Sequence, residues 1–485
     1  MQTRPVENRL HMKYVVFCSL WLPQILWCNE ETTQQWDTES FQHLLRTRMS
    51  TKSQYPTPSS EEFAALIAQD NTINNPSQQC KVIHTNFVIR HGTRFPTKKA
   101  IKKILTVHKL LVEILHSSQS PTPFDWLLSW TPPYTTENEG TLAPIGEAEM
   151  SALGTRIRNR FFNPNVPTAS DNNQATFEHT WKVRTEQSAK AFASVFISDP
   201  PINIEYRANR AGEDQVLRFY DNCPALDAQF ATETSSTRHY NEYRHSSQME
   251  ANLHHFQELF GPQGQLLTQH HLEAAYDACA FDVALLKEYL QWCQIFRSNG
   301  PEMLLSMDFF QDLKHFYRKS YGTPLAYEIA SPLLRQMITE MRNRTIGVSD
   351  VGASFKFAHA ETILPLAALM DISYSDRHKT DSENHFVGSV PLEVAETRHF
   401  KGASLAPFSA NIGFVLYECT QKGSEEGDRA AGKVFQVKTL YNERVVRFPA
   451  CGKEDVCTME QLENLFYRWI YEFDSSQVCE VPVTN

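Results

Sequence analysis

The stretch NFVIRHGTRFP, residues 86–96, decides the fold of this chain and raises its main question. Its first half is apolar and β-branched, which is typical of a buried strand. The strand ends in Arg90-His91-Gly92, and a further arginine, Arg94, follows three residues after the histidine. Two permanent positive charges oppose protonation of a neighbouring imidazole. A histidine with a purely structural role gains nothing from these charges, whereas a bound anion is stabilised by them. The stretch therefore predicts an anion site at a strand end.

Strand and helix patterns alternate on both sides of this stretch. The predicted strands cover residues 81–89, 176–183, 352–358, 408–419 and 434–448. The predicted helices cover residues 98–115 behind a Thr97 cap, 146–161 and 185–196. This order predicts an α/β fold, with a mainly parallel sheet, flanking helices and an inserted all-helical domain.

Changes in composition divide the chain into four parts. Residues 205–340 hold many helical patterns, so we expect an α-helical domain inserted into an α/β domain of residues 80–204 and 341–485. Residues 29–79 are polar and rich in Thr, Gln, Ser and Pro, and a poorly ordered lead-in and a peripheral wrap both stay open for them. Residues 1–28 are predicted to be a signal peptide.

The signal peptide is predicted from the apolar run YVVFCSLWLPQILWC, which follows Met12-Lys13. The run is too short to span a bilayer comfortably, and a buried helix is the weaker alternative at this position. Cleavage is expected near Cys28 or Asn29, and Met1 and Met12 both stay open as the start. No other long apolar segment occurs, so we expect a secreted chain without a membrane partner.

The cysteine content fits an exported protein. Eight cysteines remain after Cys18 and Cys28 leave with the signal, and an even number in this compartment indicates disulfides. No CxxC pair occurs, which argues against a zinc site. Asn343-Arg344-Thr345 is a candidate glycosylation sequon. The C-terminal CEVPVTN is not a retention signal of the endoplasmic reticulum, so the expected location is extracellular.

The net charge limits the possible partners. A formal charge of −10 argues against nucleic acid and against an anionic membrane surface. A polyanionic substrate would therefore need positive charge concentrated locally at its site.

Two predicted strands end in residues suited to phosphoryl transfer. One ends in the cluster Arg90–Arg94, the other in His359-Ala360-Glu361, and both should face one crevice at the carboxyl edge of the sheet. Arginine forks bind phosphoryl oxygens and stabilise their charge. His91 can attack phosphorus and form a phosphohistidine, and Glu361 can protonate the leaving oxygen and then activate water.

These two segments resemble the motifs of the histidine acid phosphatases. RHGTRFP matches the family pattern RHG-x-R-x-P, and KFAHAETILPL matches its late HAE form. That form is similar to the multiple inositol polyphosphate phosphatase branch, because Ala360 stands where other branches carry aspartate and Glu361 follows it. The resemblance runs from about Cys80 to Cys479.

The resemblance implies a histidine phosphatase fold and a phosphomonoesterase acting on inositol polyphosphates, including phytate, while the use of 2,3-bisphosphoglycerate stays open. It implies His91 as nucleophile and Glu361 as proton donor, without metal or cofactor. The implied phosphate ligands are Arg90, Arg94, Arg184 and His359. The implied disulfides are Cys80–Cys419, Cys223–Cys479, Cys279–Cys293 and Cys451–Cys457.

Several alternatives stay open at this level. Lys98, Lys99, Lys102 and Lys103 are candidate contacts for outer phosphates, and a solvated helix face is an equally strong interpretation. Lys314 is either a surface residue or part of a pocket. The chain could be a broad histidine acid phosphatase for small phosphomonoesters, or a non-catalytic secreted binding protein. The predicted export signal and the HAE motif argue against a phosphoglycerate mutase.

Overall fold

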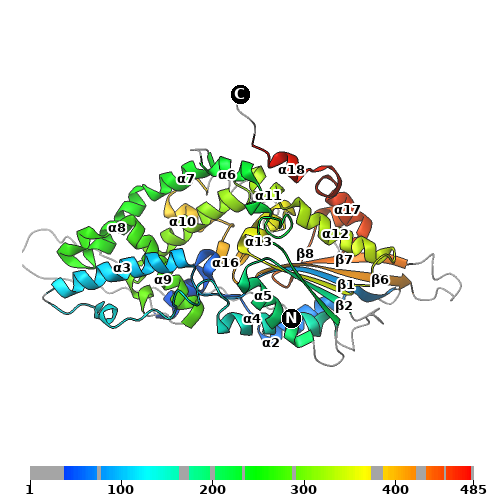
Figure 1. Cartoon of the computed structure of the whole chain (residues 1–485), viewed down its shortest axis with the longest axis horizontal. Coiled ribbons are helices and arrows are strands. Elements are labelled where there is room, and N and C mark those ends of the chain that lie inside the picture. The colour runs from blue at the N-terminus through cyan, green and yellow to red at the C-terminus, as the bar shows by residue number, and fades with distance from the viewer. Residues whose placement is uncertain are drawn as a thin grey trace, which may run out of the picture.

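A computed structural model describes residues 38–73, 78–118, 120–162, 174–196, 203–231, 235–286, 291–372, 386–421, 433–452 and 455–481. The predicted signal peptide, residues 1–28, and its cleavage site lie outside these ranges. Figure 1 shows an elongated molecule with a twisted sheet towards one end and a group of long helices towards the other.

One eight-stranded sheet forms the α/β part of the molecule. Its order is β3-β2-β5-β1-β6-β7-β8, and β9 pairs with β7. The strands are β1 Gln78–Arg90, β2 Gln174–His179, β3 Asn203–Ala208, β5 Ala353–Ala358, β6 Asn411–Gln421, β7 Lys433–Tyr441, β8 Arg444–Val446 and β9 Cys457–Thr458. The α/β class with flanking helices is confirmed, and the sheet is mixed. The expected parallel pairing holds from β3 to β1, whereas β6 to β9 are antiparallel.

Helices cover both faces of this sheet (Figure 1). One face carries α2 Ser60–Asn71, α4 Pro144–Phe161 and α5 Val183–Ala193. The other carries α12 Ser331–Thr345, α13 Ala360–Leu369 and α17 Met459–Leu465. Because side chains alternate along a strand, Phe87 and Ile89 of β1 join the core under α4 and α5, while Val88 joins the larger core on the other face.

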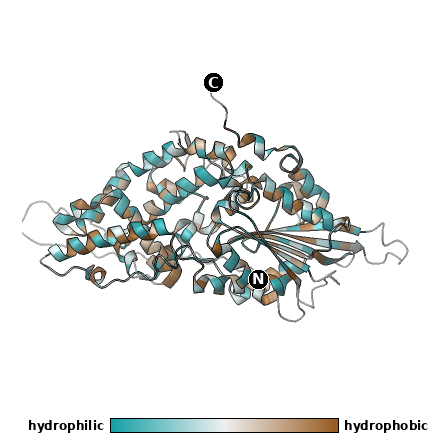
Figure 2. Cartoon of the chain, viewed as in Figure 1, coloured by the Kyte–Doolittle hydropathy of each residue, from teal (hydrophilic) through white to brown (hydrophobic). Residues whose placement is uncertain are grey.

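The second group of helices surrounds α10 Glu302–Lys319. Its other members are α3 Lys98–Ser117, α6 Pro224–Ala231, α7 Ser235–Arg244, α8 Ser247–Glu258, α9 Gln269–Leu286 and α11 Pro324–Glu328, with the short strand β4 Ser298–Pro301. Figure 2 shows hydrophilic and hydrophobic residues interspersed along them, as amphipathic helices require. Helix α3 comes from the predicted α/β domain and packs on α9 of the predicted insertion, so the domain boundaries stay a prediction.

The start of the described chain wraps around the molecule. Residues 38–73 contain α1 Thr38–Thr47 and α2, which begins with a capping box between Ser59 and Glu62. Between these helices, Ser50 and Thr51 are buried. Residues 38–73, called the wrap below, thus pack on the rest of the molecule, and the assignment of residues 29–79 as a separate N-terminal part stays a prediction.

A buried ionic network joins this wrap to α10. Arg398 Nη2 donates to the carboxylates of Asp308 and Asp312, at 2.6 and 2.8 Å. Asp312 Oδ1 also accepts from Ser50 Oγ at 2.7 Å and from the Gly402 backbone N–H at 3.0 Å. Three segments that are distant in sequence are thus fixed around one set of charges.

Four disulfides link the described cysteines. They are Cys80–Cys419, Cys223–Cys479, Cys279–Cys293 and Cys451–Cys457, the same pairs that the family resemblance implies. Asn343 is half-buried in the last turn of α12, and its glycosylation stays a prediction. Among the residues that the structure describes, no helix combines the length and the apolar character needed to cross a bilayer.

We expect Arg398→Met to lower the free energy of unfolding by about 3–5 kcal/mol, because buried Asp312 loses its cation and buried Asp308 keeps only Arg48, at 4.0 Å. Arg207→Met is the control, since Arg207 forms an exposed ion pair with Glu205 and its loss should change stability little. Urea denaturation followed by circular dichroism measures both. Equal, small losses in the two variants would contradict the role given to the buried network.

Candidate active site

The parallel pairing of β1 with β5 brings the two motifs together. Arg90 is paired with Ala358 at the ends of these strands, and the His91 backbone N–H donates to the Ala358 carbonyl at 3.0 Å. His91 and His359 therefore leave the sheet side by side, with ring centroids 5.4 Å apart. Both side chains are buried. The two strand ends share one site, as the sequence predicted.

The hydrogen bond of His91 fixes which of its nitrogens can react. Nδ1 lies 2.8 Å from the carbonyl oxygen of Gly92, and a carbonyl only accepts, so Nδ1 carries the proton. The Nε2 lone pair is then free. Burial, followed by the charges of Arg184 and Arg90, lowers the pKa of His91 well below its usual value. The imidazole is held neutral, with Nε2 as its unprotonated nitrogen.

His359 has the opposite tautomer. Arg184 Nη2 donates to its Nδ1 at 3.2 Å, so Nε2 carries the proton and donates to Thr180 Oγ1 at 3.0 Å. Burial and then Arg184 lower the pKa of His359 well below its usual value. Thr180 comes directly after β2 and is held in turn by Thr185 Oγ1 at 2.9 Å. The end of a third strand thus orients the second histidine.

Three arginines around these histidines have no counter-ion. Among the described residues, Arg90, Arg94 and Arg184 form no ion pair with a carboxylate, and the Nε of each is buried without a hydrogen-bond partner. Burial, with Arg94 among the repelling charges, lowers the pKa of Arg90 to about 9 and that of Arg184 to about 10. All three stay charged at neutral pH. A cluster of cations without counter-ions is costly unless an anion binds, so these three arginines form a candidate anion site.

Backbone carbonyls hold Arg90 in place. Its Nη1 donates to the carbonyl of Thr51 in the wrap and, at 2.5 Å, to that of Ala406. Its guanidinium lies over the ring of Phe408, 4.3 Å from the centroid. The buried network around Arg398 fixes the two segments that supply these carbonyls. It therefore helps to hold the Arg90 side chain in position.

Close backbone packing explains the glycine of the first motif. A Cβ at Gly92 would lie 2.5 Å from the carbonyl oxygen of Gly146 in α4. Next to it, the backbone N–H and Oγ1 of Thr93 donate to Glu149 at 2.8 and 2.9 Å. Helix α4 therefore clamps the loop that carries His91 and Arg94.

Arg184 and Glu361 both lie in first turns of helices. Arg184 is the second residue of α5, which begins at Val183, although the sequence placed it just before that helix. Glu361 lies in the first turn of α13, and its side chain is 39% exposed. Its Oε1 forms an ion pair with Lys319 Nζ at 2.8 Å.

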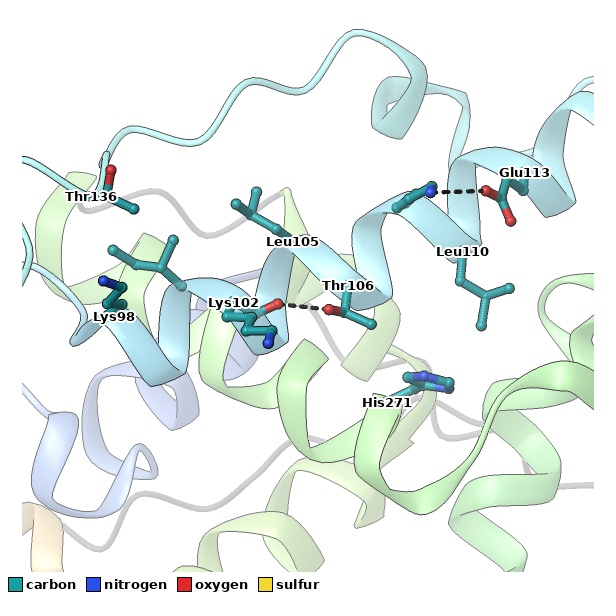
Figure 3. A pocket seen from close by; sticks show the side chains of 10 residues that line it. Lys98, Lys102, Leu105, Thr106, Leu110, Glu113, Thr136 and His271 are labelled. Carbon is teal, nitrogen blue, oxygen red and sulfur yellow. Dashed lines mark hydrogen bonds and ion pairs between the residues drawn. The ribbon is translucent and has the colours of Figure 1, made fainter.

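The lysines after the first motif lie along α3. Lys98, Lys99, Lys102 and Lys103 are exposed, and Lys98 and Lys102 line a groove of about 800 Å³ (Figure 3). Its lining also includes Leu105, Leu110, Thr136 and His271. Neither the two histidines nor the three arginines are among the described residues of this groove, and outer-phosphate contacts by these lysines stay a proposal.

Three site residues were missed in the sequence. Thr180 lies inside the predicted strand 176–183, whereas β2 ends at His179, so the prediction of too long a strand concealed that Thr180 stands at a strand end. Glu149 and Lys319 lie in helices without a motif, at positions where a charged residue usually faces solvent. Only the tertiary structure brings these two side chains to the site.

The chain matches known proteins over most of its length. The sequence profile of the histidine phosphatase superfamily (branch 2) covers residues 81–442. Multiple inositol polyphosphate phosphatase 1 from Gallus gallus is 25% identical, over 90% of this chain and 93% of that protein. The Homo sapiens protein of the same name is 23% identical, over 84% of this chain and 83% of that protein.

Solved structures share the fold. The Bifidobacterium longum multiple inositol polyphosphate phosphatase in complex with inositol hexasulfate has a TM-score of 0.65 at 17% identity, covering 86% of this chain and 97% of that chain. The phytase from D. castellii has a TM-score of 0.67 at 15% identity, covering 93% of this chain and 90% of that chain. The expected histidine phosphatase fold is confirmed.

We expect Arg184→Met to raise the pKa of both His91 and His359, because the variant removes the charge that most strongly opposes their protonation. Nitrogen-15 spectra of histidine-labelled protein, recorded against pH, measure this directly. Arg207→Met, on an exposed strand, is the control and should leave both histidines unchanged. If these two imidazoles titrate identically in wild type and Arg184→Met, the electrostatic account is wrong.

Proposed function

Because the chain belongs to branch 2 of the histidine phosphatase superfamily, we propose that it hydrolyses inositol polyphosphates, phytate among them, through a phosphohistidine intermediate. The single observation that carries this proposal is the set of three arginines without counter-ions around the neutral His91. The named activities of the relatives and the inositol hexasulfate in a structural neighbour support the substrate class.

The first step uses the geometry of the strand ends. Arg90, Arg94 and Arg184 hold the three non-bridging oxygens of one phosphate, with His359 beside them. The Nε2 lone pair of His91 attacks phosphorus as the bond to the inositol oxygen breaks. Glu361 gives its proton to that leaving oxygen, since an alkoxide leaves poorly. The products are an inositol with one phosphate fewer and a phosphorylated His91.

The second step reverses the role of the carboxyl group. Ionised Glu361 removes a proton from water, the resulting hydroxide attacks phosphorus, and the bond to His91 Nε2 breaks. Inorganic phosphate leaves and Glu361 carries a proton again. The arginine charges stabilise the transferring group in both steps, and the chain supplies the charge needed from its own side chains.

We also propose that the protein passes through the secretory pathway. Four disulfides suit an oxidising compartment, and the apolar run after Lys13 has the length of a signal-peptide core. Lys98, Lys99 and Lys102 remain proposed contacts for outer phosphates, because they are exposed on the helix that follows the phosphate-binding loop.

His91→Ala tests the proposed reaction. We expect phosphate release from inositol hexakisphosphate to fall by about 10⁴-fold or more, because the attacking atom is lost. In wild type, rapid quenching with labelled substrate should trap phosphate on the peptide that contains residues 86–96. His116→Ala, which alters an exposed histidine of α3, is the control. Phosphate release by His91→Ala at the wild-type rate, or label on another peptide, would refute the mechanism.

Glu361→Gln separates proton donation from attack. Glutamine cannot give a proton to an alkoxide, so we expect release of the first dephosphorylated inositol from inositol hexakisphosphate to slow by about 10²–10⁴-fold in a single turnover. Nitrophenolate leaves without a proton, and its first turnover from p-nitrophenyl phosphate should persist as a burst. Glu186→Gln, on an outer face of α5, is the control. An equal loss with both substrates would contradict the assignment of Glu361 as donor.

A further inference from the structure

The resting state of Glu361 conflicts with its role as proton donor. Lys319 Nζ lies 2.8 Å from Glu361 Oε1, and the carboxyl group sits in the first turn of α13, where a helix favours negative charge. Burial raises the pKa of Glu361, but Lys319, followed by other contacts, outweighs it and holds the pKa well below its usual value. An ionised carboxylate has no proton to give, so this ion pair must open before an alkoxide can leave.

Among the described residues, the charged or titratable groups around Glu361 come from the site, from α10 and from the turn that carries Tyr220. These groups are Lys319 and His315 of α10, His359 after β5, Arg90 at the end of β1, Arg94 after β1, Arg184 of α5 and Tyr220. Lys319 is the one that makes direct contact among them. Displacement of Lys319 therefore raises the pKa of Glu361 more than displacement of any other group in this set.

Lys319 belongs to a cluster of cations on the same helix. Burial, followed by Lys319, Arg318 and Lys52, lowers the pKa of Lys314 to about 8. Within the described chain, Lys314 forms no ion pair with a carboxylate, and Glu361 is the partner of Lys319. Lys52 is paired with Asp277 at 3.0 Å. The C-terminal half of α10 thus presents positive charge to the side of the site where Glu361 lies.

We propose that Lys319 makes proton donation depend on a second phosphate: a phosphate next to the scissile one draws the ammonium group of Lys319 away from Glu361 and so allows Glu361 to bind a proton. This inference rests on the proposed function of the His91 site and adds to it a determinant of substrate selection. A doubly charged phosphate competes well for an ammonium group that a single carboxylate holds.

The expected sequence is balanced in charge and protons. Lys319 forms an ion pair with the neighbouring phosphate, Glu361 takes a proton from solvent, and the proton passes to the inositol oxygen as its bond to phosphorus breaks. With a monophosphate of a simple alcohol, Lys319 stays on Glu361 and the leaving alkoxide lacks a donor. The site then favours polyphosphates through a faster chemical step, in addition to any tighter binding of these substrates.

The test compares three substrates in wild type and Lys319→Met. For inositol hexakisphosphate, kcat/KM should fall by about 10- to 100-fold, because a charged contact is lost. For glycerol phosphate, kcat/KM should rise, and the alkaline limb of its pH profile should move to higher pH, since Glu361 keeps its proton longer. The first-turnover burst of nitrophenolate should not change, because that leaving group needs no proton.

Two further variants serve as controls for this interpretation. Lys319→Arg keeps the charge and should retain the preference for the hexakisphosphate. Lys433→Met removes another lysine–glutamate pair, with Glu418, at the far end of the sheet, and should behave as wild type. If Lys319→Met does not fold, as judged by its melting temperature, Lys319→Gln takes its place in the same assays.

The possible failures can be told apart. A proportional loss on all three substrates, or a pH limb for glycerol phosphate that does not move, overturns the proposal for Lys319. A wild-type protein that releases no phosphate from inositol hexakisphosphate overturns the proposed function itself. In that case the wild-type protein shows no activity on inositol hexakisphosphate, and this result is seen before any variant is compared.

Discussion

The parallel contact between β1 and β5 is the constraint from which the site follows. Their register pairs Arg90 with Ala358, so His91 and His359 must leave the sheet next to each other at its carboxyl edge. This pairing bridges the 261 residues between Arg94 and Lys356 and brings two short segments together at one edge of the sheet. Strand β2 extends the same edge and adds Thr180, with Arg184 close behind it.

The second feature of the site is positive charge that no carboxylate neutralises. Two buried arginines elsewhere in the described molecule are matched by carboxylates: Arg398 by two aspartates and Arg160 by Asp70. At the strand ends the arginines face imidazoles that their own charge keeps neutral. Burying such a set lowers stability unless an anion completes it. The protein tolerates that cost through its large cores and four disulfides.

Much of this arrangement could be predicted from the sequence, because strand periodicity and strand-end motifs are local signals. They located His91, His359 and Glu361 on one sheet edge. The rest depends on contacts between distant segments, which leave no local pattern. Thr51 looked like part of a polar lead-in, yet its carbonyl accepts from Arg90. Lys319 ends an amphipathic helix, and only the fold places it on Glu361. The antiparallel half of the sheet was likewise hidden, since strand patterns do not report direction.

The most direct measurement of the central claim is a crystal structure with orthovanadate, which mimics a phosphoryl group during transfer. The account predicts vanadium bonded to His91 Nε2, its oxygens held by Arg90, Arg94 and Arg184, and His91 Nδ1 still donating to the Gly92 carbonyl. Vanadium bonded to any other side chain, or bound away from these arginines, would contradict it.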